Sequence, residues 1–450
     1  MRSRTAFTTT AAATPRTTAP AALAARAVMA GFGALLLAAC GALPGMGTTP
    51  APAQPAAAPT AEQPATAPAA VVPAAASPAP AAPAAPPPVL SFDDAVLAAA
   101  TTLLGRAQLP PDTSFDLVID PLIDGVTGQQ TQATRAMGTR IVKIIKEGYP
   151  RYVVQPFNTD SVKRGPLLLV GTFTGVNGER KTEGKREAFR ICLALADLKT
   201  GKLVGKGLAF ARADGVDITP QGADRDAPAW VEDEATLGYI RTCQGTRPGD
   251  AIHPGYINRV LTSAKLAEAN DAYGAAKFAQ ARTLYTQALA GEGGDQLRTH
   301  TGLYLTNWRL GNRKAAAESF GRIVDQGLEN KRLGTKFLFR PGTAALWSDP
   351  KAGATPYTMW LQEIATRSAS RASCLELVGH TSASGPEPVN ERLSLLRAED
   401  LKKQIAQRAP PLAPRMIASG QGSRQTMIGT GRDDASDVLD RRVEFKVVGC

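Results

Sequence analysis

The chain has few of the residue types that build catalytic or metal centres. Its 450 residues include only three histidines and five cysteines. The histidines are scattered, and no two cysteines have the CxxC spacing typical of zinc sites. It also lacks a GxSxG nucleophile elbow, a Walker phosphate loop and an HExxH pair. We therefore expect a protein that is not an enzyme and holds no cofactor or metal, with an enzyme hidden in residues 91–250 as the alternative.

A long apolar run is also missing near the N-terminus. The apolar stretch of residues 27–39 is too short to span a bilayer as a stable helix. It follows a segment with four arginines and no acidic residue, and it ends at Leu37-Ala-Ala-Cys40. This layout predicts a secretory signal over residues 1–40 and resembles a bacterial lipobox, in which Cys40 is diacylated. The alternative is a cysteine that merely ends an apolar helix.

The lipobox resemblance also implies an address for the protein. Two or three acyl chains hold a protein stably on a membrane, whereas one chain gives marginal binding. Gly41 follows the cysteine, in place of the Asp that retains some lipoproteins at the inner membrane. The resemblance therefore implies an outer-membrane lipoprotein on the periplasmic face, with the outer membrane as a partner through the lipid anchor.

The excess of basic residues is modest. The net charge falls from +11 to +7 without the signal, which holds four basic residues and no acidic one. No nucleic-acid recognition motif or aromatic-interleaved basic stripe is present, so we expect no nucleic-acid partner. The charge favours attraction to anionic wall polymers and lipid headgroups.

Residues 41–88 are mostly proline and alanine. Such a segment cannot bury enough apolar surface to fold, so we expect a disordered, extended linker that tethers the rest of the chain to the membrane. An inert low-complexity spacer predicts the same structure.

Residues 91–250 have the pattern of an α/β domain. Ser91-Phe-Asp-Asp94 is typical of a helix start with a capping box. The turn Asp197-Leu-Lys-Thr-Gly201 resembles one in small α/β domains of envelope lipoproteins, including activators of penicillin-binding proteins and flagellar and curli assembly lipoproteins. The resemblance implies a module that binds an envelope protein. The expected elements are strands at 117–119, 152–157, 167–170, 187–197 and 202–211 and a helix at 131–146.

Residues 257–330 resemble tetratricopeptide repeats, which are pairs of antiparallel helices. The set Ala281, Tyr285 and Leu289 recurs 35 residues later as Ala316, Phe320 and Val324, close to the repeat's period of about 34 residues. Gly311 stands where the turn between two helices often needs glycine. Two repeats are too few for a freestanding solenoid, so we expect the unit to pack on a neighbouring domain. It serves either as a partner groove or as a helical spacer.

Two motif segments mark residues 335–450. The first runs from Gly379-His-Thr-Ser382 through the sequence Asn-Glu-Arg-Leu-Ser-Leu-Leu-Arg at 390–397, and the second is Asp440-Arg-Arg-Val443. They resemble the OmpA-like peptidoglycan-binding domain, whose members grip the zwitterionic amino acid of the cell-wall stem peptide. Apolar patterning agrees with the implied βαβαβ sandwich. It predicts strands at 337–339, 374–378 and 443–447, a helix face of Tyr357, Trp360, Leu361 and Ile364, and a helix at 390–408.

The resemblance implies a binding site for the stem peptide formed by Thr381, Ser382, Asn390, Leu393, Arg397 and Arg442. The Arg397 guanidinium is expected to bind the ligand carboxylate, and Asn390 to cap the helix that carries it. The family has Asp where this chain has Ser382, and Asn where it has Asp440. A serine cannot neutralise an ammonium. Either binding is weaker or another carboxylate replaces it, from among Asp433, Asp434, Asp437 and Asp440, which otherwise form a solvated helical face.

One histidine of the Gly-His-Thr-Ser motif and four cysteines spread over the chain also carry structural expectations. We expect His380 to be a buried structural residue of its turn. Once Cys40 carries lipid, four cysteines remain, which allow three pairings, and the periplasm is oxidising. We favour Cys192 with Cys243 and Cys374 with Cys450, since each pair lies inside one predicted domain. The second bridge requires its two strands to be antiparallel neighbours.

The sequence thus predicts a multidomain α/β protein with two functional hypotheses. In the first, an outer-membrane lipoprotein binds peptidoglycan non-covalently and scaffolds envelope partners. In the second, an assembly or regulatory lipoprotein has lost wall binding, and its OmpA-like domain serves protein–protein interaction. Whether peptidoglycan sediments the protein separates the two.

Overall fold

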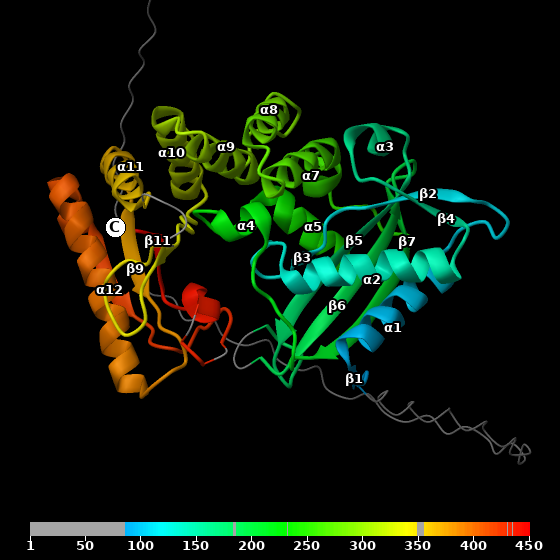
Figure 1. The fold of residues 1–450 in the computed structure, drawn as a ribbon, viewed down its shortest axis with the longest axis horizontal. Helices are drawn as coiled ribbons and strands as arrows, with labels where there is room; N and C mark the ends of the chain where they lie inside the picture. Colours follow the sequence, from blue (N-terminus) through cyan, green and yellow to red (C-terminus); the bar gives the residue numbers. More distant parts are fainter. Residues whose placement is uncertain (1–85, 183–185, 232, 349–354, 430, 434) are drawn as a thin grey trace, which may run out of the picture. The chain divides into compact units, whose positions relative to one another are not determined.

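The computed structural model describes residues 86–450, apart from residues 183–185, 232, 349–354, 430 and 434 (Figure 1). The predicted signal, Cys40 and most of the Pro/Ala linker lie outside the described residues. The chain divides into two units, Met1–Ala81 and Ala82–Cys450, and all of the described residues belong to the second. Across the residues described, no helix is long and apolar enough to cross a membrane.

A seven-stranded mixed sheet organises the N-terminal part of this unit. Its order is β1-β7-β6-β5-β2-β4, and β3 pairs with β5. β5, β6 and β7 are antiparallel neighbours, whereas β2 runs parallel to β4 and β5. The strands are β1 (Val89–Leu90), β2 (Phe115–Ile119), β3 (Ile123–Asp124), β4 (Tyr152–Gln155), β5 (Leu167–Val176), β6 (Ala188–Asp197) and β7 (Lys202–Arg212).

Helices cover both faces of this sheet. Leu167 and Leu169 of β5 share a core with α1 and α2, whereas Leu168 and Val170 share another with α5 and α6. This alternation explains why β5 is an almost continuous apolar run, since successive side chains point to opposite faces. The helices are α1 (Phe92–Gly105), α2 (Gln132–Gly148), α3 (Thr159–Lys163), α4 (Gly222–Asp226), α5 (Glu234–Gln244) and α6 (Pro254–Ile257).

Local sequence signals of this domain have clear structural counterparts. The Ser91 hydroxyl accepts a hydrogen bond from the Asp94 amide at 3.2 Å and caps α1. Asp197–Gly201 closes the β6–β7 hairpin, with Gly201 at a φ of 67° that glycine adopts without strain. The carboxylate of Asp197 accepts the Lys199 amide at 2.9 Å.

Two helical hairpins come next, over the segment predicted to contain them. They are α7 (Val260–Gly274) with α8 (Phe278–Leu289), and α9 (Leu297–Arg309) with α10 (Arg313–Glu329). Ala281 and Tyr285 of α8 and Ala316 and Phe320 of α10 are all buried. Gly311 forms the α9–α10 turn with a φ of 78°. The tetratricopeptide assignment itself stays a prediction.

The helical hairpins share their hydrophobic core with the C-terminal part of the chain. Phe320 of α10 stacks on Trp360 with ring centroids 5.3 Å apart. The indole of Trp360 donates a hydrogen bond of 2.9 Å to the Tyr304 hydroxyl of α9. The two hairpins therefore bury their apolar face against a neighbour, because they are too few to bury it among themselves.

The C-terminal part contains a four-stranded sheet of order β10-β9-β11-β8. β11 is antiparallel to both β9 and β8, and β10 is parallel to β9. Leu375 and Leu377 share one core with α11 and α12. The elements are β8 (Phe337–Leu338), α11 (Tyr357–Ala369), β9 (Cys374–Gly379), α12 (Glu387–Arg408), β10 (Met416–Gly420) and β11 (Arg442–Val448), with single 3-10 turns at Pro410–Arg415 and Ala435–Leu439.

Two expectations for this region need correction. β10 was not predicted, so the order is βαβαββ rather than βαβαβ. It is a short edge strand whose Ile417 side chain is exposed, which weakens any apolar pattern. Second, α12 begins at Glu387 after Pro386, so Asn390 lies inside the helix and is not its N-cap.

Candidate functional site

The Gly-His-Thr-Ser motif lies where β9 ends against α12. β9 ends at Gly379, and His380, Thr381 and Ser382 follow as buried residues. A Cβ on Gly379 would lie 1.9 Å from the backbone oxygen of Ser394. The motif glycine thus allows the strand end and the helix to touch backbone to backbone.

Asn390 holds the turn between the motif and the helix. Its side-chain amide donates a hydrogen bond of 3.0 Å to the backbone oxygen of Ser384 and one of 3.5 Å to that of Gly385. It therefore positions residues 382–385, which is a different role from the predicted capping. Leu393 lies one turn further along α12 and is half-buried.

Arg397 is fully enclosed by the protein. Its side chain is 0 % exposed. Its Nε, Nη1 and Nη2 atoms donate to the backbone oxygens of Thr343 at 2.9 Å, His380 at 2.9 Å and Arg340 at 3.1 Å. Burial, and secondarily the charge of Arg441, lowers the pKa of Arg397 to about 10, still well above neutrality. The guanidinium that is expected to bind the ligand carboxylate is therefore not accessible in this structure.

The segment that covers Arg397 is the β8–α11 loop, residues 339–347. Two of the three carbonyls that receive the guanidinium belong to it. The loop folds on itself, with the Arg340 amide donating to the Ala345 oxygen at 3.0 Å. No local sequence signal indicated that this loop reaches Arg397.

A carboxylate from another segment lies against the serine of the motif. The Ser382 hydroxyl donates a hydrogen bond of 2.5 Å to Oδ1 of Asp433. The same oxygen forms an ion pair of 2.8 Å with Arg441. The Asp433 side chain is 24 % exposed, so part of it remains accessible to solvent. The fold thus places a carboxylate, itself paired with Arg441, beside Ser382.

The other described aspartates of this segment have internal roles. Asp440 is buried, and its carboxylate accepts the backbone amides of Met427, Ile428 and Gly429. Asp437 is also buried and accepts the Asp433 amide at 3.1 Å. Asp434 lies outside the described residues. Because these two carboxylates are enclosed, a solvated helical face does not describe them.

Arg442 is likewise held inside the protein. Its Nε atom donates to the Glu444 carboxylate, and its Nη1 atom donates to the Gln425 backbone oxygen at 3.2 Å. Glu444 also accepts the Trp230 indole at 3.0 Å. Arg442, which the resemblance implies as part of the stem-peptide site, is therefore paired inside the protein, as is Arg441 with Asp433.

His380 and Thr381 each keep one buried polar atom without a partner among the described residues, namely Nδ1 and Oγ1. Burial, and secondarily the charge of Arg442, lowers the pKa of His380 to about 3. The imidazole is therefore neutral at physiological pH, as befits a structural histidine.

The structure contains the two disulfides expected from the sequence. Cys192 of β6 bonds Cys243 of α5, with Cα atoms 6.0 Å apart. Cys374 of β9 bonds Cys450, with Cα atoms 5.1 Å apart. The second bond joins antiparallel neighbours, in which Cys374 pairs with Val448. Among the described residues, no group of three or more His, Cys, Asp and Glu is arranged to hold a metal ion.

Comparison with known proteins gives matches to solved structures alone. No protein-family model and no curated protein matches the chain. The peptidoglycan-associated lipoprotein from Burkholderia pseudomallei is 20% identical, with 25% of this chain and 89% of that chain covered and a TM-score of 0.22. The periplasmic domain of Helicobacter pylori MotB is 16% identical, with 25% and 68% covered and a TM-score of 0.20.

A third similar structure is the cell wall anchor of the T6SS from Pseudomonas aeruginosa. It is 17% identical, with 29% of this chain and 97% of that chain covered and a TM-score of 0.22. Because the TM-scores are this low, these similarities carry no functional argument. The resemblance to OmpA-like domains continues to rest on the motif residues themselves.

Proposed function

We propose that this chain is a lipid-anchored envelope protein whose C-terminal domain binds peptidoglycan non-covalently, with Asp433 as the acidic half of the site. The observation that carries the proposal is the hydrogen bond of 2.5 Å between Ser382 and Asp433. It brings a partly exposed carboxylate next to Ser382, which stands where the resembled family has an Asp. A carboxylate pairs well with the ammonium of a stem peptide, since charge-assisted hydrogen bonds are the stronger ones.

The guanidinium half of the site requires a movement of the β8–α11 loop. Displacing residues 339–347 frees two of the Arg397 donors from the backbone oxygens of Arg340 and Thr343. Each hydrogen bond to a charged group contributes about 1.5–3 kcal/mol. A ligand carboxylate that takes over both donors offsets that loss, because a guanidinium fork matches a carboxylate.

The remaining modules fit a tether between membrane and wall. Lipidation at Cys40 provides the outer-membrane anchor, and residues 41–88 provide reach. The α/β domain and the helical hairpins provide surfaces for envelope partners. These assignments rest on the sequence patterns.

A second candidate function is favoured by the burial of Arg397 and Arg442. In that case the C-terminal domain has lost wall binding and serves protein–protein interaction, and Arg397 is a structural tie between α12 and the β8–α11 loop. The protein then assembles or regulates an envelope complex.

Sedimentation of the full-length protein in detergent with purified peptidoglycan tests the proposal. We expect the protein to pellet, and Asp433→Asn to weaken binding by at least about tenfold through loss of a charge-assisted pair. Glu399→Gln is the matched control, because Glu399 is an exposed carboxylate of α12. Thermal unfolding verifies that both variants are folded.

Two outcomes contradict the proposal in different ways. If the folded protein stays in the supernatant, wall binding is wrong and the interaction role is favoured. If Asp433→Asn pellets as well as the parent, the domain binds peptidoglycan but Asp433 is not the acidic group.

A further inference from the structure

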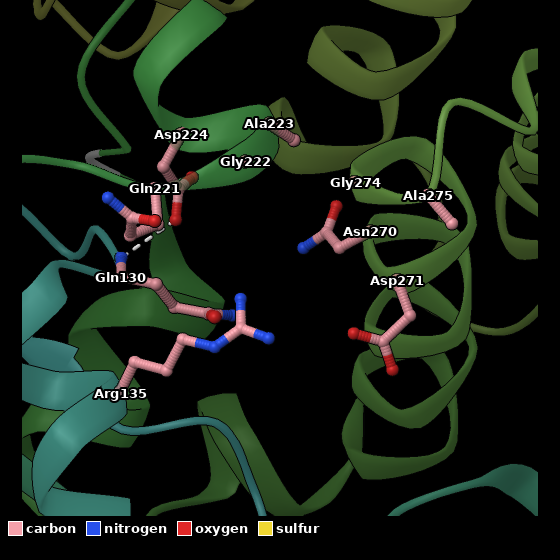
Figure 2. Close-up of a pocket in the computed structure, with 10 residues that line it drawn as sticks. All are labelled: Gln130, Arg135, Gln221, Gly222, Ala223, Asp224, Asn270, Asp271, Gly274 and Ala275. Carbon is pink, nitrogen blue, oxygen red and sulfur yellow. Dashed lines mark hydrogen bonds between the residues drawn. The ribbon is translucent and has the colours of Figure 1, made fainter.

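A polar cavity of about 300 Å³ lies between α2, α4 and α7 (Figure 2). This volume is at the lower end of the range for small-molecule sites, about 300–1,000 Å³. The cavity involves none of the C-terminal motif residues. Its polar lining residues are Gln130, Arg135, Gln221, Asp224, Asn270 and Asp271.

Arg135 on one side of this cavity and Asp271 on the other carry opposite charges, and the carboxylate of Asp224 also lines the cavity on the side of Arg135 (Figure 2). The guanidinium of Arg135 extends from α2 toward the carboxylate of Asp271 on α7 (Figure 2). Both residues are exposed, and among the described residues their side chains form no ion pair with each other and the Arg135 guanidinium makes no hydrogen bond. A cation and an anion held apart over a hollow can each pair with a ligand group of opposite charge.

Asn270 adds an oriented hydrogen-bond donor to the α7 wall. Its Oδ1 atom accepts a hydrogen bond of 2.5 Å from the hydroxyl of the buried Tyr285. That bond orients the amide, and its nitrogen points toward the cavity (Figure 2). An amide nitrogen donates to a carboxylate and cannot accept from an ammonium.

The wall opposite α7 is held rigidly by hydrogen bonds. The backbone N–H of Gln130 donates to the Asp224 carboxylate at 2.7 Å, and the backbone N–H of Gln221 donates to the Gln130 backbone oxygen at 2.9 Å. The side chain of Gln129 reaches the Asp224 backbone oxygen at 3.1 Å. Because the wall is already ordered, a ligand does not bear the entropy cost of forming it.

We propose that this cavity binds a small zwitterion of amino-acid or dipeptide size, with its carboxylate on Arg135 and Asn270 and its ammonium on Asp271. Neither a simple anion nor a simple cation satisfies both charged walls. This site is independent of wall binding by the C-terminal domain, and it assigns a ligand class to the region that joins the α/β domain to the helical hairpins.

Isothermal titration of the full-length protein with alanyl-alanine tests the proposal. The control ligand is the same dipeptide with an acetylated amine and an amidated carboxyl, which keeps the shape and removes both charges. We expect the free dipeptide to bind at least about tenfold more tightly than the capped one, because each charge loses a charge-assisted pair. Equal binding of the two ligands, or no binding of the free dipeptide at millimolar concentration, overturns the proposal.

Variants locate the binding in the cavity. Arg135→Gln and Asp271→Asn are each expected to weaken binding by at least about tenfold. Lys143→Gln is the matched control, since Lys143 is an exposed cation of α2 that does not line the cavity. Unchanged affinity in both cavity variants places the dipeptide elsewhere and overturns the proposal.

A steric variant removes the cavity without touching its charges. A Cβ on Gly274, the last residue of α7, meets no atom within 4 Å. We therefore expect Gly274→Leu to fold normally and to abolish binding by filling the cavity. Retained binding in this variant also contradicts the assignment.

Discussion

The hydroxyl of Ser382 donates a hydrogen bond of 2.5 Å to the carboxylate of Asp433, although 51 residues separate the two in the chain. The fold therefore brings a carboxylate beside the serine of the Gly-His-Thr-Ser motif. The same carboxylate oxygen pairs with Arg441 at 2.8 Å, so Asp433 also fixes the start of β11. One side chain thus serves both the candidate site and the packing of the domain.

Replacing Arg397 tests how strongly the β8–α11 loop is held. Arg397→Met keeps much of the side-chain volume but leaves three buried carbonyls without donors. We expect a loss of about 3–5 kcal/mol in the free energy of unfolding, measured by urea denaturation. Arg392→Met, at an exposed position of the same helix, should change it by less than about 0.5 kcal/mol. Equal effects would mean that the loop is already open in solution.

Asp120 should make stability depend on pH. It is buried, and its carboxylate accepts a hydrogen bond from the Tyr256 hydroxyl. Burial raises the pKa of Asp120 to about 7, partly offset by Tyr256 and by the charge of Arg298. The folded protein therefore keeps this proton between pH 4 and 7 while the unfolded chain has lost it, so stability falls as pH rises through this window.

The variant Asp120→Asn isolates this contribution, because an amide cannot ionise but still accepts the Tyr256 hydrogen bond. Between pH 4 and pH 8, the contribution of Asp120 to the free energy of unfolding of the parent should fall by on the order of 4 kcal/mol. The variant should not show this fall. Urea denaturation at several pH values measures the difference. Identical pH profiles for the two proteins would show that Asp120 is ionised in the folded state. The other buried carboxylates are the same in the two proteins, so their contributions to the pH profiles cancel in the comparison.

The Cys374–Cys450 disulfide should be a main source of stability for the C-terminal sheet. It closes a segment with a sequence separation of 76 residues. In the chain-entropy model, a loop of this length contributes about 4.5 kcal/mol. The double variant Cys374→Ala with Cys450→Ala should lose about that amount in urea denaturation under oxidising conditions. A variant as stable as the parent would indicate that the bond adds strain equal to its entropic benefit.

A residue larger than glycine at position 379 should destabilise the fold. In Gly379→Ala, the new methyl group would lie 1.9 Å from the Ser394 backbone oxygen, so α12 must shift away from β9. We expect a loss of about 1–3 kcal/mol in unfolding free energy. Gly148→Ala, at a helix position where a Cβ meets no atom within 4 Å, should instead stabilise by about 0.4–1 kcal/mol. Thermal unfolding distinguishes a loss from a gain.

Features carried by neighbouring residues were predictable from the sequence. The start of α1 at Ser91 and the β6–β7 turn at Gly201 depend on interactions over a few residues. The helices that carry Tyr285 and Phe320 were predictable because the spacing of their apolar residues follows the helix repeat, which is also local. The two disulfides followed from domain boundaries, which composition and pattern already indicate.

The state of the candidate site depended on contacts between distant segments. The Arg397 motif is recognisable in the sequence, but whether its guanidinium reaches solvent depends on the carbonyls of Arg340 and Thr343, more than fifty residues earlier. Likewise, four aspartates were equivalent in sequence, and only the fold brings Asp433 to Ser382. The amino-acid order determined which chemical groups were available. Tertiary structure decided which of them were buried or partnered, because burial and charge pairing depend on atoms that the chain brings together only on folding.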